Sequence, residues 1–533
     1  MKHQFFWIGF IFYVFQSCSP SNSYDLIILN GSVYDGTGVA GQKLDIGIKE
    51  DQIVKIGQLD STEARRVIDA EGLIVSPGFI DTHVHLDPMD NFIKLADAES
   101  HIRQGVTTSF GGPDGRGVPQ GYGFKEFLDS IEKVGMGMNV GFLTGHNKIR
   151  KEVMGLDNRA PTEEELNQML SMVSQAMKEG AYGISTGLKY LPGNFSRVDE
   201  VIALSKAASN KKGVYTSHLR DEGLEIMPAI REAIQISKDA DIRVVLTHHK
   251  VIGKPMWGKS NETLALVDSA RQKGIKIRLD QYPYNASHTG ISVLIPTWAR
   301  AGGPSAFKSR VENPIQRKKI ENEIIFNILN DRGGDDLRRI QFAKVNWMPE
   351  LEGKTLYDWA LMMKMEPTLA NGAKLVIQAQ LKGGAKCIFH AMDEADVENI
   401  MKHPYTMIAS DGRLSEPGVG HPHPRAYGTF PRVLGYYVRD KKIISLPEAI
   451  YKMTLLPAES FGLKKRGVLK EGYKADLTIF DEKVVADKAT FVSPHQYPVG
   501  ISYVIVNGKL VLEEGVFKGI KAGEVLRKNL SGS

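Results

Sequence analysis

The stretch GFIDTHVH, residues 78–85, decides the fold: it is a short apolar run that ends in two histidines, His83 and His85. Alternate residues of a strand point to the same face, so both imidazoles are expected to face one point. Alternating strand–helix units indicate a parallel sheet, and eight of them predict an α/β protein with a closed (β/α)8 TIM barrel over residues 75–464. The seven further strand segments are residues 106–112, 139–147, 182–188, 214–220, 243–250, 276–284 and 405–412.

The two ends of the chain differ from this pattern. Residues 24–74 and 465–520 contain short strands separated by Gly, Asn and Asp turns, which is typical of antiparallel sheet. We expect them to combine into a small β-sandwich domain built from both termini. Residues 290–385, after the seventh barrel strand, are predicted to be an insertion that forms a lid over the barrel mouth. A peripheral decoration of the barrel is the alternative interpretation.

The first residues resemble a targeting segment. Lys2 precedes the apolar run FFWIGFIFYVF, which is too short to span a bilayer but suits the core of a signal peptide. We expect residues 1–17 to be a signal peptide and Cys18 to be lipidated, as in a periplasmic or outer-membrane lipoprotein of a bacterium. Ordinary secretion and an uncleaved anchor are the alternatives. Membrane contact is then expected only through the lipid anchor.

Composition limits the possible partners. Lys and Arg number 67 against 62 for Asp and Glu, and no long basic block occurs. Nucleic-acid binding therefore has no support from the sequence. The sequence does not determine the oligomeric state.

Polar residues gather where the predicted strands end, which is where barrel enzymes carry their active sites. A lone histidine there is more often structural, but four histidines and two carboxylates together indicate a metal centre. Imidazole and carboxylate groups suit zinc or a similar divalent ion. The candidate ligands are His83, His85, Asp114, His218, His248 and Asp411.

Several motifs carry a family resemblance. PGFIDTHVH, SHLRDE, THHK, ASDG and GVLKEGYKADLTIFD are similar to motifs of the amidohydrolase superfamily of metal-dependent hydrolases. STGLKYLPG, DQYPYNASHT, HPHPRAYGTFPRVLG and FVSPHQYPVGISYVIVNG resemble the D-aminoacylase, or N-acyl-D-amino-acid deacylase, family. The matches extend over nearly the whole chain after the signal segment.

The resemblance implies a reaction and a ligand set. His83 and His85 would hold one metal ion, His218 and His248 another, and Asp411 would be both a ligand and the catalytic base. Hydroxide formed from metal-bound water would remove the N-acyl group from N-acyl-D-amino acids. One or two divalent ions, zinc by resemblance, are expected as cofactors.

The resemblance also implies a small-molecule substrate with a free carboxylate. Arginine offers a bidentate fork to such a group, whereas lysine and tyrosine add single donors. His288 stands where the family usually has a serine, which is a departure from its pattern. The residues at the matching positions are Tyr190, Lys250, Tyr282, His288 and Arg425.

Asp114 marks a second departure from the family. It occupies the place of a cysteine that ligates metal in the D-aminoacylases. A carboxylate can bridge two cations, so we expect Asp114 to do so. Lys189 is the competitor, because many amidohydrolases bridge their metals with a carboxylated lysine near this place. Lys189 and Tyr190 are neighbours on a strand and should face opposite sides.

Three other functions compete with deacylation. A cyclic-amide hydrolase of the dihydroorotase or hydantoinase kind and a dipeptidase would use the same scaffold. A non-catalytic surface scaffold descended from such an enzyme is the third. The intact set of candidate ligands argues against the scaffold, which has no need to bind metal.

Overall fold

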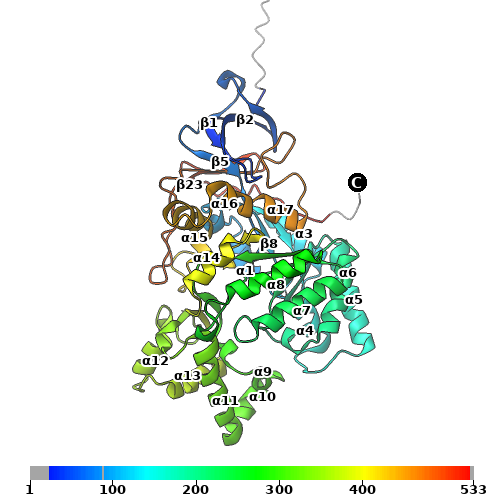
Figure 1. Ribbon diagram of the computed structural model, residues 1–533, viewed down its shortest axis with the longest axis vertical. Coiled ribbons are helices and arrows are strands. Elements are labelled where there is room, and N and C mark those ends of the chain that lie inside the picture. The colour runs from blue at the N-terminus through cyan, green and yellow to red at the C-terminus, as the bar shows by residue number, and fades with distance from the viewer. Residues whose placement is uncertain (1–22, 87–88, 120, 529–533) are drawn as a thin grey trace, which may run out of the picture.

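The computed structural model describes residues 23–86, 89–119 and 121–528 (Figure 1). The predicted signal peptide and Cys18 lie outside these residues. Within them, no helix is both long and apolar enough to cross a bilayer.

Each of the eight predicted strand segments contains a strand, and within each sheet neighbouring strands pair in parallel. The third segment is divided into two strands, so nine strands form two sheets, one of three strands and one of six. Only Leu143 separates the third strand of the first sheet from the first strand of the second, so the sheets follow one another along the chain. Their strands are β6 (Phe79–Asp81), β8 (Val106–Gly111) and β9 (Asn139–Phe142), then β10 (Thr144–Gly145), β11 (Gly183–Gly187), β12 (Val214–His218), β13 (Arg243–Leu246), β14 (Ile277–Gln281) and β18 (Thr406–Ile408).

The first and last of these strands also meet. Two short strands that continue them, β7 (Val84–His85) and β19 (Gly412–Arg413), pair in parallel. The Ser410 amide donates a hydrogen bond to the Asp81 carboxylate at 3.0 Å. These contacts bring the two ends of the strand series to one place.

Amphipathic helices connect the parallel strands. In α5 (Glu163–Lys178), Thr162 caps the Glu165 amide while the Glu165 carboxylate accepts from the Thr162 amide. Its buried residues, Met169 and Val173 among them, recur on one face and pack on the sheet. The other connecting helices are α1 (Met89–Lys94), α2 (Glu99–Ile102), α3 (Phe124–Val134), α4 (His146–Met154), α6 (Val198–Ser209), α7 (Ile226–Asp239), α8 (Ser260–Gln272) and α14 (Glu394–Lys402).

Four helices follow β18 and β19 along the chain. They are α15 (Arg425–Arg432), the π-helix Val433–Asp440, α16 (Leu446–Met453) and α17 (Leu455–Phe461).

The two chain ends combine, as predicted, but in one nine-stranded mixed sheet rather than in two separate sheets. Strand β1 pairs with β2 antiparallel and with β4 and β5 parallel. Strand β4 lies off the path that links the other eight strands. The C-terminal strands join through β20, which pairs antiparallel with β5. The strands are β1 (Leu26–Val33), β2 (Gln42–Lys49), β3 (Gln52–Gly57), β4 (Val67–Asp69), β5 (Ile74–Pro77), β20 (Leu477–Phe480), β21 (Ile501–Val506), β22 (Lys509–Glu513) and β23 (Val516–Phe517).

The predicted insertion forms a separate lobe at the end of the molecule opposite the terminal sheet (Figure 1). Its three strands make a small antiparallel sheet in the order β15-β17-β16. Its elements are β15 (Ser287–Gly290), α9 (Thr297–Arg300), α10 (Gly303–Glu312), α11 (Pro314–Asn327), β16 (Ile340–Lys344), α12 (Leu356–Met362), α13 (Leu369–Leu381) and β17 (Lys386–Phe389).

An aromatic contact ties a central barrel strand to the C-terminal helices. The Phe110 ring on β8 is fully buried and lies 4.1 Å from the Phe461 ring centroid and 4.9 Å from that of Tyr182. We expect Phe110→Ala to lower the free energy of unfolding by about 3–5 kcal/mol, because it removes a large buried side chain and leaves a cavity. Urea denaturation followed by circular dichroism measures the change.

The control for this prediction is Val492→Ala, since the Val492 side chain is 88% exposed. Its stability should match that of the wild type. Equal midpoints for the Phe110 variant and the control would show that the contact between β8 and α17 does not stabilise the barrel.

Candidate metal centre

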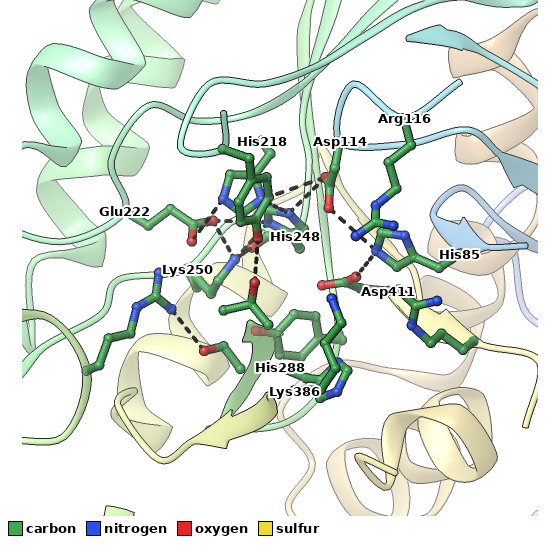
Figure 2. A pocket seen from close by; sticks show the side chains of 16 residues that line it. His85, Asp114, Arg116, His218, Glu222, His248, Lys250, His288, Lys386 and Asp411 are labelled. Carbon is green, nitrogen blue, oxygen red and sulfur yellow. Dashed lines mark hydrogen bonds and ion pairs between the residues drawn. The ribbon is translucent and has the colours of Figure 1, made fainter. Parts of the chain in front are cut away.

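The six predicted ligands come together at the carboxyl ends of the parallel strands. Figure 2 labels five of them, all but His83. They divide into two groups of side-chain donor atoms, and within each group all atoms lie within 4.8 Å of one another. One group contains His83, His85, Asp114 and Asp411; the other contains Asp114, His218 and His248. All six residues are buried.

Asp114 belongs to both groups. Its Oδ1 atom lies 3.5 Å from His83 Nε2 and 3.4 Å from His248 Nε2, while its Oδ2 atom lies 3.5 Å from His85 Nε2. Figure 2 shows the carboxylate between His248 and His218 on one side and His85 on the other. Burial raises the pKa of Asp114, but His83 and the other histidines outweigh it and hold that pKa well below its ordinary value. The residue is therefore an anion at neutral pH.

The backbone at these positions is strained. Asp114, His248 and Asp411 have φ angles of +54°, +38° and +47°, in the left-handed region that non-glycine residues rarely occupy. Such conformations cost on the order of 1–3 kcal/mol each and concentrate at functional sites. The chain is closely packed next to Asp114, since a Cβ at Gly115 would lie 2.0 Å from Asn147 Oδ1.

Asp411 faces both a histidine and an arginine. Its Oδ1 atom lies 3.0 Å from His85 Nε2, and its Oδ2 atom lies 2.9 Å from Arg425 Nη1. Burial raises the pKa of Asp411, yet Arg425 and the neighbouring histidines together outweigh burial, and the net pKa falls well below its usual value. Asp411 is therefore ionised at neutral pH and able to accept a proton.

His218 and His248 are neighbours on adjacent strands. His218 Nδ1 lies 2.7 Å from His248 Nε2, and both atoms face Asp114. Behind them lies Glu222, a buried residue absent from the predicted set, whose Oε1 atom is 3.1 Å from His248 Nδ1. The signal that could have revealed it is its place four residues after His218 in SHLRDE.

The donor atoms fit a divalent ion. A ligand atom lies about 2 Å from zinc, which puts two ligands of one tetrahedral ion about 3.3 Å apart. The separations of 3.4 Å and 3.5 Å around Asp114 are close to that value and longer than ordinary hydrogen bonds. His83 Nε2 and Asp114 Oδ1 are buried without a hydrogen-bond partner, although they face each other. The donor set can therefore hold a cation shared through Asp114.

A pocket of about 470 Å³ opens beside these ligands. Of the five predicted substrate-binding residues, Tyr190, Lys250, Tyr282 and His288 line it. Arg425 does not; it is buried 4.6 Å from the Tyr282 ring centroid and paired with Asp411. Sequence reasoning missed Ser287, Thr289, Arg332 and Lys386, which the insertion and its flanking strands contribute, and also Arg116 and Arg413.

Two lysines near the centre have acidic partners. The Lys189 ammonium is 2.7 Å from Asp221 Oδ2 and 3.6 Å from Asp331 Oδ2. The Lys250 ammonium lies 2.5 Å from Glu222 Oε1, 2.9 Å from the His248 carbonyl and 2.7 Å from His248 Nδ1, and Lys250 also lines the pocket.

Comparison with known proteins assigns a family to this arrangement. A sequence profile described as the Amidohydrolase family matches residues 66–280 and 330–512. A D-aminoacylase of Alcaligenes xylosoxydans xylosoxydans is 34% identical over 541 residues, which cover 96% of this chain and 99% of that protein. An N-acyl-D-glutamate deacylase of the same organism is 34% identical over 529 residues, covering 95% and 97%.

Solved structures agree with the sequence matches. The N-acyl-D-glutamate deacylase of Bordetella bronchiseptica, solved with zinc and a phosphonate mimic of the tetrahedral intermediate, superposes with a TM-score of 0.79. It is 32% identical, and the match covers 95% of this chain and 99% of that one. A D-hydantoinase, 14% identical with a TM-score of 0.57 over 95% and 100% of the two chains, shares the fold alone. The chain belongs to the amidohydrolase family, and within it to the group of D-aminoacylases and N-acyl-D-amino-acid deacylases.

Proposed function

We propose that this protein is a metal-dependent hydrolase that removes the acyl group from N-acyl-D-amino acids. The observation that carries the proposal is the buried Asp114 carboxylate, shared by two groups of histidines at the edge of a pocket. The D-aminoacylase and N-acyl-D-glutamate deacylase that resemble the chain over almost its whole length support it.

The cofactor in this proposal is one or two divalent ions, zinc first. His83, His85 and Asp411 would hold one ion, His218 and His248 would hold the other, and Asp114 would bridge them. When bound, such ions polarise an amide carbonyl and make water nucleophilic near neutral pH. A carboxylate at the shared position is a harder ligand than a thiolate, which favours tolerance of manganese or cobalt.

Asp411 would be the catalytic base in this proposal. It is ionised, borders the pocket and can take a proton from the attacking water. The same carboxyl would then donate that proton to the leaving nitrogen. Arg425 favours the ionised form before the reaction because it lies 2.9 Å away.

The free carboxylate of the substrate would meet the polar wall formed by the predicted residues of the pocket. The Tyr190 hydroxyl lies 3.1 Å from Thr289 Oγ1, which places it at the rim between barrel and insertion. Tyr282 packs on Arg425, and His288 lies on β15 next to Thr289. The residues proposed for this role are Tyr190, Lys250, Tyr282, His288 and Arg425.

The finer architecture is also part of the proposal. The β7–β19 pair and the Ser410–Asp81 hydrogen bond support closure of the parallel strands into an eight-stranded barrel. The apolar cluster of the terminal sheet, which includes Ile28, Ile46 and Leu477, supports its folding over into a sandwich. The domains would then be residues 24–74 with 465–520, the barrel 75–464, and the insertion 290–385. An experimental structure with open sheet edges at β6 and β18 would contradict closure.

A panel of N-acetyl-D- and N-acetyl-L-amino acids tests the activity. Zinc-loaded protein should hydrolyse D-substrates selectively, with activity lost to a chelator and restored by zinc. Asp411→Asn should lower kcat about 10²–10⁴-fold, because an amide cannot relay a proton. Asp268→Asn is the control, since Asp268 also contacts a histidine, His403, but does not line the pocket. Hydrolysis of L-substrates only, or of none, would refute the proposal.

The shared position of Asp114 predicts a coupled loss of metal. Asparagine tolerates a left-handed backbone, so Asp114→Asn should keep the fold but remove the bridging anion. Zinc affinity should fall by at least the roughly 10–100-fold that loss of an outer-shell partner costs. Chelator competition and elemental analysis measure it, with the exposed Asp335→Asn as control. Unchanged zinc content in Asp114→Asn would assign the carboxylate to the turn alone.

We further propose that the protein is an exported lipoprotein whose Cys18 carries the lipid, on the evidence of its N-terminal sequence. In a bacterial host, the wild type should then sediment with membranes and enter the detergent phase. Cys18→Ser should release it or leave an unprocessed precursor, whereas Cys387→Ser should behave as the wild type. Equal partitioning of the two variants would argue for secretion or an uncleaved anchor.

A further inference from the structure

A single buried glutamate, Glu222, lies behind both histidines of the second ligand group. Its side chain approaches the two ring nitrogens that point away from Asp114: Oε1 is 3.1 Å from His248 Nδ1, and Oε2 is 3.7 Å from His218 Nε2. Figure 2 shows Glu222 on the far side of these imidazoles from Asp114. The Glu222 carboxylate and the Asp114 carboxylate therefore lie on opposite sides of the two imidazole rings.

The tautomer of His248 depends on this contact. A metal-binding Nε2 needs its lone pair free, so the ring hydrogen must sit on Nδ1 and be accepted by a neighbour. Glu222 Oε1 is such an acceptor. Lys250 Nζ, 2.7 Å from the same Nδ1, is only a donor and favours the opposite tautomer, with the hydrogen on Nε2 facing Asp114. Glu222 and Lys250 therefore act on His248 in opposite directions.

His218 also needs an acceptor for its ring hydrogen. Its Nδ1 faces His248 Nε2 and Asp114, so its hydrogen belongs on Nε2. His218 Nε2 and Glu222 Oε2 are both buried without a hydrogen-bond partner and face each other. A closure of a few tenths of an ångström would satisfy both atoms, because N–H···O bonds reach about 3.2 Å.

Lys250 supplies the charge that lets Glu222 stay buried. Its ammonium lies 2.5 Å from Glu222 Oε1, and a buried carboxylate without a cation would be costly.

We propose that Glu222 is a positioning residue that fixes the metal-binding tautomers of His218 and His248, and that Lys250 serves as its counter-ion. The inference rests on the proposed function, because it requires the two histidines to be metal ligands. Carboxylates that orient metal-ligating histidines commonly affect metal affinity about 10–100-fold.

The test compares apparent zinc affinity by chelator competition in the full-length protein. Glu222→Leu should weaken zinc binding about 10–100-fold, since no acceptor is left for either ring hydrogen. Glu222→Gln, which keeps a neutral acceptor, should lose less. Glu222→Leu combined with Lys250→Met should regain part of the affinity, because the donor that favours the wrong tautomer is gone. This double variant also avoids an unpaired buried lysine.

A matched control is available outside the site. Glu200 is buried and accepts from His146 at 2.8 Å, but it does not line the pocket. Glu200→Gln should leave zinc affinity unchanged, which separates a specific effect from general destabilisation. Equal zinc affinity in the wild type, Glu222→Leu and Glu222→Gln would overturn the inference while leaving the proposed function intact. A wild type that binds no zinc would instead overturn the proposed function.

Discussion

The candidate metal centre depends on one carboxylate, that of Asp114, which lies close to two groups of histidines. Asp114 stands between His83 and His85, which follow the first barrel strand, and His218 and His248, which follow the fifth and sixth. No other residue of the described chain belongs to both ligand groups. The parallel strands make this possible because their carboxyl ends all open at the same face. Any shift of β8 relative to β12 would separate Asp114 from one group.

The same constraint explains where the backbone is strained. In a strand that simply continued, successive side chains would point to alternate faces of the sheet. The left-handed turns at Asp114, His248 and Asp411 redirect these three side chains. Strained backbone of this kind persists where the surrounding structure holds it, and the chain is closely packed next to Asp114, where a Cβ at Gly115 would lie 2.0 Å from Asn147 Oδ1. The strained turns therefore bring these three side chains to the same place as the other candidate ligands.

Much of the centre could be predicted from the sequence, for a physical reason. His83 and His85 alternate on a strand, and strand ends in a parallel barrel converge, so linear spacing already implied proximity. Glu222 could not be identified in this way, because it lies in the loop after β12 and its direction depends on Lys250 and His248. Lys250 lines the pocket, but the partners of its ammonium include Glu222, a neighbour that spacing does not reveal.

The pocket residues that the insertion contributes were harder to predict from the sequence. Arg332 comes from a π-helical turn and donates to Ser287 Oγ, so its position depends on how a long crossover folds back. Lys386 begins a strand that pairs with β15, and that pairing also has no local sequence signal. The two halves of the site consequently have different physical origins. The strand ends fix the ligands rigidly, whereas the insertion supplies the opposite wall of the pocket. Sequence changes in the insertion can therefore alter which acyl group or side chain fits, while the ligands on the strands keep their geometry.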